Sequence, residues 1–308
     1  MRASLLAGSV ILVAGASEAQ ALPTGGSVAA GSATITAVTS QLTVRQSTQN
    51  AVINWQSFGI GRGEGVTFVQ PNSNSVALNR VVGQVPTAIL GSLTANGKVF
   101  VVNPNGVLFG QGAQVNVAGL VASTLGIADS DFMAGRYSFS GSGGSVVNRG
   151  TIVADGGYVV LLGANVSNTG LISARLGSVA LAAGTAATLD VGGTGLLTVT
   201  VDRGAVDALA DNGGMIVADG GNVVMTARGA SGLLKTAVNN SGVIQARSIG
   251  TRNGSIMLLG DAANGVVEVG GTLDASGAAA ATTGGAIVAT GNAVDITGTV
   301  DASGSAGG

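Results

Sequence analysis

The chain repeats a short unit, and this repetition constrains its fold more than any other feature. Asn-x-Gly followed by an apolar run recurs in four segments, which begin at Asn148, Asn168, Asn212 and Asn240. The hexamer Ile-Val-Ala-Asp-Gly-Gly occurs twice without change, at 152–157 and 216–221. Repetition at roughly 20–50 residues indicates units that bury a continuous core only by stacking on one another. The sequence therefore predicts a solenoid.

Each unit contains two or three short apolar runs separated by Gly, Asn, Ser or Thr, a pattern typical of strands and turns. Strands of about 4–6 residues are too short to bury a face alone, but stacked units pair them about 4.8 Å apart. Gly and Asn supply the positive φ angles of the corners, where asparagines can also stack as ladders. A period of 20 to 28 residues favours a parallel β-helix over a leucine-rich repeat. We predict an all-β parallel β-helix solenoid with short helical or loop excursions.

The core of this solenoid is predicted to be narrow in most coils, because only 3 % of the residues are aromatic. Five of the nine aromatic residues lie between positions 55 and 109, where we expect a bulkier core: Trp55, Phe58, Phe68, Phe100 and Phe109.

Three segments interrupt the period and carry helix signals: residues 126–135, 202–212 and 230–240. In the second and third, Asp202 and Ser231 can cap a helix, and apolar residues at helical spacing follow. These residues are Val206, Leu209, Ala210, Leu233, Leu234, Ala237 and Val238. We predict helical excursions of one to three turns, with plain loops as the alternative. They would account for the 44 residues between Gly170 and Gly214, about the length of two coils.

The first 21 residues have the organisation of a secretory signal peptide. Arg2 supplies the positive charge, Leu5 to Ala14 is a short apolar segment, and Ala19-Gln20-Ala21 is a small-x-small cleavage site. The apolar segment is shorter than the roughly 20 residues that a spanning helix needs. We predict cleavage after Ala21, export to the periplasm and beyond, and no stable transmembrane segment.

Composition argues against most kinds of chemistry. The chain has no Cys and no His, which removes thiolate sites and the commonest general base. Its net charge of −2, with scattered Arg, argues against nucleic-acid binding. The glycine-rich loop at 59–65 lacks the strand–turn–helix context of a phosphate site, and Asp155 and Asp219 do not follow a calcium nonapeptide pattern. We expect no catalytic residues, no metal and no cofactor.

The segment from Asn54 to Leu125 resembles the N-terminal secretion domain of filamentous haemagglutinin-type adhesins, the exoproteins of two-partner secretion in Gram-negative bacteria. Four short stretches carry the resemblance: Asn54-Trp55-Gln56-Ser57-Phe58, Phe68-Val69-Gln70-Pro71, Ala77-Leu78-Asn79-Arg80-Val81 and Asn103-Pro104-Asn105-Gly106-Val107. The ordered series is far more specific than any one of them alone.

The resemblance implies a right-handed parallel β-helix. It also implies a partner, an outer-membrane transporter barrel with periplasmic recognition domains, through which the chain passes unfolded before it folds outside. On this basis we divide the chain into a signal peptide (1–21), a secretion domain with an N-terminal cap and the first coils (22–145), and haemagglutinin-like repeats (146–308) that begin a longer shaft.

Two turns are candidate recognition sites for the transporter. Asn103, Pro104, Asn105 and Gly106 have the composition of a type I turn between two apolar strands. Gln70, Pro71 and Asn72 form a strand-end turn of similar composition. The family usually carries two Asn-Pro-Asn motifs; the second matches Asn103 to Asn105, and the identity of the first is left open. The transporter either reads the Asn-Pro-Asn-Gly turn or only needs the coil that it holds together.

The leading hypothesis is a non-enzymatic exoprotein that is secreted or displayed at the cell surface and acts as an adhesin-like shaft, with host-cell or other surface receptors as further partners. A polysaccharide-active β-helix enzyme is the alternative, and a self-transporting passenger with its own barrel is a third. From Ser276 the chain is mostly Ala, Gly, Thr and Ser. We therefore expect either that the last coils fray or that the native chain continues.

Overall fold

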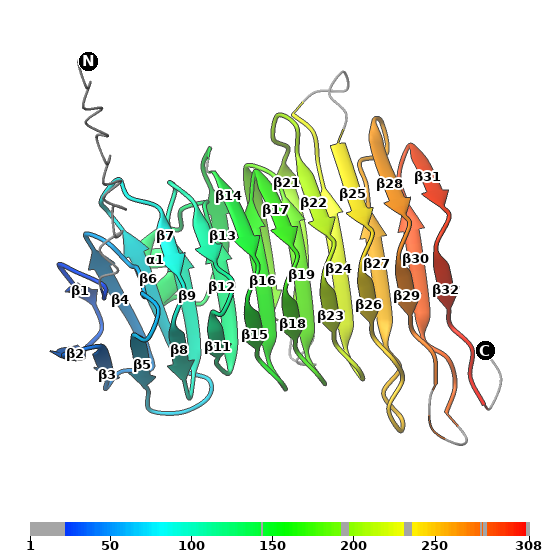
Figure 1. Ribbon diagram of the computed structural model, residues 1–308. Coiled ribbons are helices and arrows are strands. Elements are labelled where there is room, and N and C mark those ends of the chain that lie inside the picture. Colours follow the sequence, from blue (N-terminus) through cyan, green and yellow to red (C-terminus); the bar gives the residue numbers. More distant parts are fainter. Residues whose placement is uncertain are drawn as a thin grey trace, which may run out of the picture.

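The computed structural model describes residues 22–142, 144–191, 197–230, 236–277, 279 and 282–305. Three long sheets run side by side along the molecule, and from β7 (Thr87–Ile89) onward each coil contributes one strand to each sheet (Figure 1). The predicted N-terminal signal peptide, residues 1–21, lies outside the described residues. The described ends of the chain lie at opposite ends of the solenoid (Figure 1).

Sheet 1 contains, in spatial order, β1 (Ser27–Ala30), β4 (Asn50–Trp55), β6 (Val76–Val81), β9 (Lys98–Val102), β12 (Gly119–Ser123), β16 (Tyr158–Gly163), β19 (Ser178–Ala183), β24 (Asn222–Ala227), β27 (Ser255–Leu259) and β30 (Ala286–Thr290). Sheet 2 contains β2 (Ala33–Val38), β3 (Gln41–Gln46), β5 (Gly65–Val69), β8 (Ser92–Ala95), β11 (Gln114–Asn116), β15 (Thr151–Val153), β18 (Leu171–Ser173), β23 (Met215–Val217), β26 (Val243–Gln245), β29 (Thr272–Asp274) and β32 (Thr299–Asp301). Sheet 3 contains β7 (Thr87–Ile89), β10 (Val107–Phe109), β14 (Ser145–Asn148), β17 (Asn165–Asn168), β22 (Leu209–Asn212), β25 (Thr236–Asn240), β28 (Gly265–Val269) and β31 (Ala293–Ile296).

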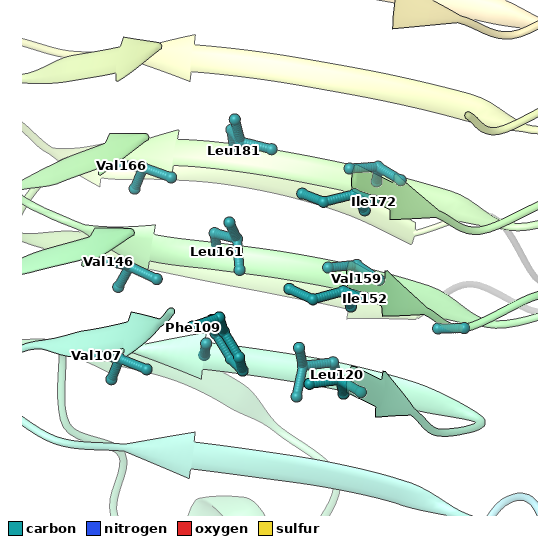
Figure 2. Packing of buried hydrophobic residues seen from close by; sticks show 14 of the residues in the cluster. Val107, Phe109, Leu120, Val146, Ile152, Val159, Leu161, Val166, Ile172 and Leu181 are labelled. Atoms are coloured by element: carbon teal, nitrogen blue, oxygen red, sulfur yellow. The ribbon is translucent and has the colours of Figure 1, made fainter. Parts of the chain in front are cut away.

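Stacking in register builds the core, as the repeats predict. Ile152, Ile172, Ile216 and Ile244 pair on successive strands of sheet 2, and each is fully buried. Figure 2 shows the same arrangement for Val146 and Val166 in sheet 3 and for Leu161 and Leu181 in sheet 1. Equivalent positions of consecutive coils thus fill one continuous interior. The predicted all-β, right-handed parallel β-helix is confirmed.

The asparagines that open the repeats form a ladder inside one corner of the solenoid. The Nδ2 group of Asn148 donates to Oδ1 of Asn168 at 2.8 Å, Asn168 to Asn212 at 2.7 Å, and Asn212 to Asn240 at 2.7 Å. All four side chains are fully buried. The predicted asparagine ladder is therefore present, and each amide is paired with the next coil rather than left unsatisfied.

The N-terminal end is closed by strands of opposite direction. β1 pairs antiparallel with β4, and β2 pairs antiparallel with β3, whereas the strands that follow in the three sheets pair parallel. Next to this cap, the Trp55 and Phe58 rings meet edge to face with centroids 5.5 Å apart. The Trp55 Nε1–H donates to Oδ1 of the buried Asn79 at 3.0 Å. The bulkier first core thus contains four of the five aromatics; Phe100 packs elsewhere.

Phe100 faces outward from sheet 1 into a second apolar cluster. A small antiparallel sheet, here called the cover sheet, lies over this face and consists of β13 (Tyr137–Ser140), β20 (Ala186–Val191) and β21 (Leu197–Arg203). Phe132 and Phe139 pack on Phe100, with ring centroids 5.6 and 6.3 Å away. The cover sheet therefore hides an outer face of sheet 1 that is as apolar as the interior.

The three predicted excursions have different outcomes. The first contains the helix α1 (Asp129–Met133), as predicted. A helix over 202–212 is wrong: β21 continues to Arg203 and β22 begins at Leu209, with Val206 exposed between them. In the third segment, 236–240 form β25 rather than a helix, while Ser231, Leu233 and Leu234 lie outside the described residues.

The 44 residues between Gly170 and Gly214 form one coil, not two. β18 pairs directly with β23, and β19 pairs directly with β24. The extra length is the β20–β21 hairpin of the cover sheet. The hairpin leaves and rejoins the solenoid where Thr185 N donates to Arg203 O at 2.8 Å. The excursion is a hairpin because the Leu-Thr-Val-Thr-Val run at 197–201 alternates with the period of a strand.

The proposed boundary at residue 145 stays a prediction. The three sheets continue across it, with β10 paired to β14, β11 to β15 and β12 to β16.

Candidate functional site

The Asn-Pro-Asn-Gly segment forms a closed turn between β9 of sheet 1 and β10 of sheet 3. Gly106 N donates to Asn103 O at 3.1 Å, and Asn105 N donates to Oδ1 of Asn103 at 3.0 Å. Asn103 is fully buried, whereas Pro104 and Asn105 are exposed. Gly106 has φ +119°, a conformation that disfavours other residues. The motif therefore has a buried base and an exposed tip.

The buried base ties three coils together. Nδ2 of Asn103 donates to Val85 O and to Thr87 Oγ1 of the preceding coil, both at 3.0 Å. Asn103 N donates to Ser123 O of the following coil at 2.9 Å. At the tip, Nδ2 of Asn105 donates to Gly83 O at 3.0 Å. Asn103 thus has every polar group of its side chain engaged within the fold.

The second candidate turn is organised in the same way. Gln70 is buried, and its Nε2 donates to Oε1 of Gln46 at 3.0 Å and to Ser75 O at 3.2 Å. Pro71 and Asn72 are exposed. The Asn72 Oδ1 accepts the amide of Asn74 at 2.9 Å, which closes a local turn. Gln70 thus pairs with a buried amide of the preceding coil, as the ladder asparagines pair with their neighbours, but its own Oε1 is buried without a hydrogen-bond partner.

The structure does not bring the two turns together. The Gln70 turn precedes β6, whereas the Asn103 turn follows β9, and β6 and β9 are parallel neighbours in sheet 1. The turns therefore lie at opposite corners, separated by a strand of about 3.3 Å per residue over five residues. A single partner surface that reads both must extend across the width of sheet 1.

An exposed apolar corner lies directly beside the Asn103 turn. Val82 and Val85 are 52 and 62 % exposed, Pro86 is exposed, and their segment accepts the hydrogen bonds of Asn103 and Asn105. The sequence pattern alone does not single out this corner, because Val-Val-Gly-Gln-Val-Pro reads as another buried strand. The one sequence signal that indicates a turn here is Gly83 followed three residues later by Pro86.

Arg80, within one of the stretches that carry the resemblance, attaches α1 to sheet 1. Its Nη2 lies 2.6 Å from Oδ1 of Asp129 and donates to Ile127 O at 2.6 Å. On the same sheet, burial lowers the pKa of Lys98, whose Nζ lies 5.5 Å from the centroid of the Tyr158 ring. Burial, with the nearby Tyr137, raises the pKa of Tyr158. Arg80 thus holds α1 against sheet 1.

Among the described residues, the most deeply buried carboxylate is that of Asp219, and its hydrogen bonds to Gln245 and Arg247 are here called the Asp219 staple. Asp219 accepts from Arg247 Nη2 at 2.8 Å, from the Arg247 amide at 2.9 Å and from Gln245 Nε2 at 2.8 Å. Burial by itself would raise the pKa of Asp219, but these hydrogen bonds outweigh it and hold the pKa below its ordinary value. Asp219 thus joins consecutive coils.

Within the described part of the chain, no three Asp, Glu, His or Cys residues are grouped so that they could hold a metal ion. Among the same residues, no helix has the length and apolar character needed to cross a membrane.

Fold and turn together define a secretion domain of the β-helix class. A family model described as the TPS secretion domain, where TPS denotes two-partner secretion, matches residues 19–275. The chain belongs to this family. Exoproteins of the family are secreted or associated with the cell surface.

Known proteins support the same assignment. Two relatives, both named heme/hemopexin-binding protein and both from Haemophilus influenzae, are 35 % identical over 261 residues and 34 % identical over 245 residues. The matches cover 79 and 72 % of this chain but only 28 and 26 % of the relatives. The chain therefore spans about a quarter of the length of these proteins.

Two crystal structures share the fold. The HMW1 secretion domain from Haemophilus influenzae has a TM-score of 0.70 and 28 % identity, and the match covers 92 % of this chain and 91 % of that one. The filamentous hemagglutinin secretion domain has a TM-score of 0.51 and 20 % identity, with coverage of 91 and 98 %.

Proposed function

We propose that this domain directs export of a non-enzymatic exoprotein through a partner outer-membrane barrel, and that the β-helix continues as an adhesin-like shaft. Secretion domains of this family engage an outer-membrane transporter. The observation that carries the proposal is the Asn103 turn, which stands inside the family match and combines an inter-coil clamp with an exposed Pro-Asn tip.

The burial of the turn limits how the transporter can read it. In the folded domain only Pro104 and Asn105 are accessible, because Asn103 is fully buried and Gly106 is buried as well. A partner that reads the Asn103 side chain therefore meets it before the coil closes. This agrees with a chain that crosses the barrel unfolded, because strands such as β9 are then free to add to a sheet edge of the partner.

Folding of the chain outside the cell favours its outward transport, because the folded coils cannot pass back through the barrel. Each strand pairs with its counterpart one coil earlier, so the first closed coils are a template for those that follow. The inward-facing Val294, Ile296 and Val300 of the last described coil are 42, 48 and 45 % exposed. These side chains are suited to burial by a further coil, which supports the proposed shaft.

Dependence on the transporter is the direct test of the export function. The full chain is expressed in a Gram-negative host with and without a two-partner transporter barrel, and the culture medium is assayed by immunoblot. We expect folded, protease-resistant protein in the medium only when the barrel is present. Equal release without the barrel would contradict the proposal.

A further inference from the structure

The outer face of sheet 3 changes character along the solenoid. One column of outward-facing positions runs through its strands, and each residue of the column pairs with its counterpart in the next coil. On β7, β10 and β14, beside the Asn103 turn, the column is apolar and consists of the partly exposed Ala88, Leu108 and Val147. In the later coils it is polar or acidic and consists of Ser167, Asp211, Asn239, Glu268 and Asp295. The apolar outer positions of this column are thus confined to the coils next to the turn.

The exposed corner that precedes β7 continues this apolar surface. Val82 and Val85 are 52 and 62 % exposed, and Pro86 is exposed as well. Pro86 also adjoins the turn, because a Cβ atom placed on Gly106 would lie 3.9 Å from the Pro86 Cβ. The combined surface is here called the sheet 3 patch, and it consists of Val82, Val85, Pro86, Ala88, Leu108 and Val147.

Hydrogen bonds fix the sheet 3 patch to the exposed tip of the turn, Pro104 and Asn105. Nδ2 of Asn105 donates to Gly83 O at 3.0 Å, and Nδ2 of Asn103 donates to Val85 O at 3.0 Å. Tip and patch are therefore parts of one surface. A protein that binds the tip also lies against Val85.

The sheet 3 patch contains no charged side chain. Between Arg80 and Asp129 the only charged residue is Lys98, which lies on β9 of sheet 1. Contiguous exposed apolar surface on a soluble protein marks an interaction site, and charged residues are depleted at the centre of protein interfaces. The patch therefore fits an apolar, uncharged face of a partner protein.

We propose that the sheet 3 patch is the apolar part of the surface that docks on the outer-membrane transporter, with the tip of the Asn103 turn at its rim. The proposal rests on the proposed export function, because the transporter is the partner that reads the tip and the tip adjoins the patch. All of the patch except Val147 lies within residues 82–108, which form one coil from the corner before β7 to β10. Docking therefore requires this coil to close and leaves the rest of the chain free to cross the barrel unfolded.

The double variant Val82→Ser/Val85→Ser tests the patch, because it removes apolar surface and leaves the residues of the turn in place. The full chain is co-expressed with the two-partner transporter barrel in a Gram-negative host, and the culture medium is assayed by immunoblot. We expect about ten-fold less secreted protein than for the native chain, since a few apolar side chains dominate most interfaces. Val206→Ser/Val243→Ser is the matched control, because these valines are 62 and 37 % exposed elsewhere. The control should be secreted like the native chain.

Melting temperatures of the purified variants separate docking from folding. The serine variant should melt within a few degrees of the native chain, because both valines are exposed. If it does not fold, Val82→Thr/Val85→Thr keeps nearly the same side-chain shape and should give a smaller loss of secretion. Secretion of the folded patch variant at the level of the control would overturn the proposal.

Two further outcomes are distinguishable. Equal release of the native chain without the barrel would contradict the export function itself, whereas barrel-dependent release that the patch variant leaves unchanged would overturn only the docking patch. Size-exclusion chromatography of the purified native chain should show a monomer. A dimer that Val82→Ser/Val85→Ser dissociates would place a second copy of the chain on the patch and would also overturn the proposal.

Discussion

At the scale of single residues, Asn212 occupies the middle of the asparagine ladder. Asn212→Ala removes the acceptor of Asn168 and the donor to Asn240, and leaves both buried amides short of a partner. We expect a loss of about 2–3 kcal/mol in the free energy of unfolding, measured by urea denaturation followed by circular dichroism.

Asn239→Ala is the control for this prediction. Asn239 lies on the same strand as Asn240 but on the outer face, where its Nδ2 donates to Asp211 at 2.7 Å. The loss should stay below about 1 kcal/mol because water can replace the bond. Equal losses for the two variants would mean that the ladder adds nothing beyond an ordinary surface hydrogen bond.

The Asp219 staple predicts a pH dependence. Its pKa is lower in the folded chain than its ordinary value of about 3.9, so the ionised carboxylate stabilises the fold above that value. The contribution is lost as the pH falls through the folded pKa. Asp219→Asn should therefore be less stable than the native chain at pH 7, and the difference should shrink below about pH 4. Thermal melts across pH check this, and a difference that is independent of pH would contradict it.

Single residues also show what the sequence can predict. The corner role of Asn103 follows from a turn motif between two apolar runs, and the ladder follows from asparagines at a fixed place in each repeat. The partnership of Asn79 with Trp55 does not, because only the register of β4 and β6 turns Asn79 into the core. Which side chains of the two turns are buried likewise depends on neighbouring coils.

At the scale of elements, the β20–β21 hairpin is the clearest departure from expectation. The helix signal at 202–212 comprises a capping residue and a few apolar side chains, whereas the strand that precedes it gains a partner in β20 and an apolar face to cover. Tertiary contacts of this kind determine the secondary structure where the local sequence preference is weak. The alternation of apolar and polar residues in 197–201 is the stronger local pattern. It does not reveal that this strand pairs with β20, because neither strand belongs to the repeated unit.

Removal of the hairpin should expose the face beneath it while leaving the solenoid closed. Residues 186–202 are replaced by Asn-Gly, which spans the gap because Thr185 N already bonds to Arg203 O at 2.8 Å. The replacement removes Leu189 and Leu197, which are buried in the native chain, and the burial of each such side chain is worth about 1.5–3 kcal/mol. We expect retained β-sheet circular dichroism, a lower melting temperature and new binding of a hydrophobic dye. Complete unfolding, or no dye binding, would contradict this description.

At the scale of the whole molecule, the two described ends differ. The first coils are closed by β1 and β2, whereas the inward side chains of the last described coil are partly exposed. Acidic residues also accumulate: the described residues after Arg252 contain Asp261, Glu268, Asp274, Asp295 and Asp301 and no Lys or Arg. Like charges on neighbouring strands are destabilising.

Hydrogen exchange should therefore follow a gradient along the solenoid. We expect the slowest amides in β12, β16 and β19, beneath the cover sheet, and progressively faster exchange toward β30, β31 and β32. Mass spectrometry of peptic fragments resolves the coils. Uniform protection from β19 to β32 would show that the solenoid unfolds as one unit and would contradict the gradient.

The period of the repeats sets the architecture of the whole molecule, which is why the β-helix is predictable from the sequence. The cover sheet and the antiparallel pairing of the cap do not follow from the repeats, because both use segments that lie outside them; the existence of an N-terminal cap is implied only by the family resemblance. Their positions depend on which apolar faces the stacked coils leave uncovered.

Our central proposal is that the transporter recognises the exposed tip of the Asn103 turn, Pro104 and Asn105, while the buried base of the turn has a structural role. Secretion of the double variant Pro104→Ala/Asn105→Ser, co-expressed with the barrel, tests it most directly. Thr169→Ala/Ser241→Ala changes two other exposed corners and is the control. The account predicts about ten-fold less secreted protein for the tip variant alone, with its melting temperature within a few degrees of the native chain. Unchanged secretion by a folded tip variant would contradict the claim.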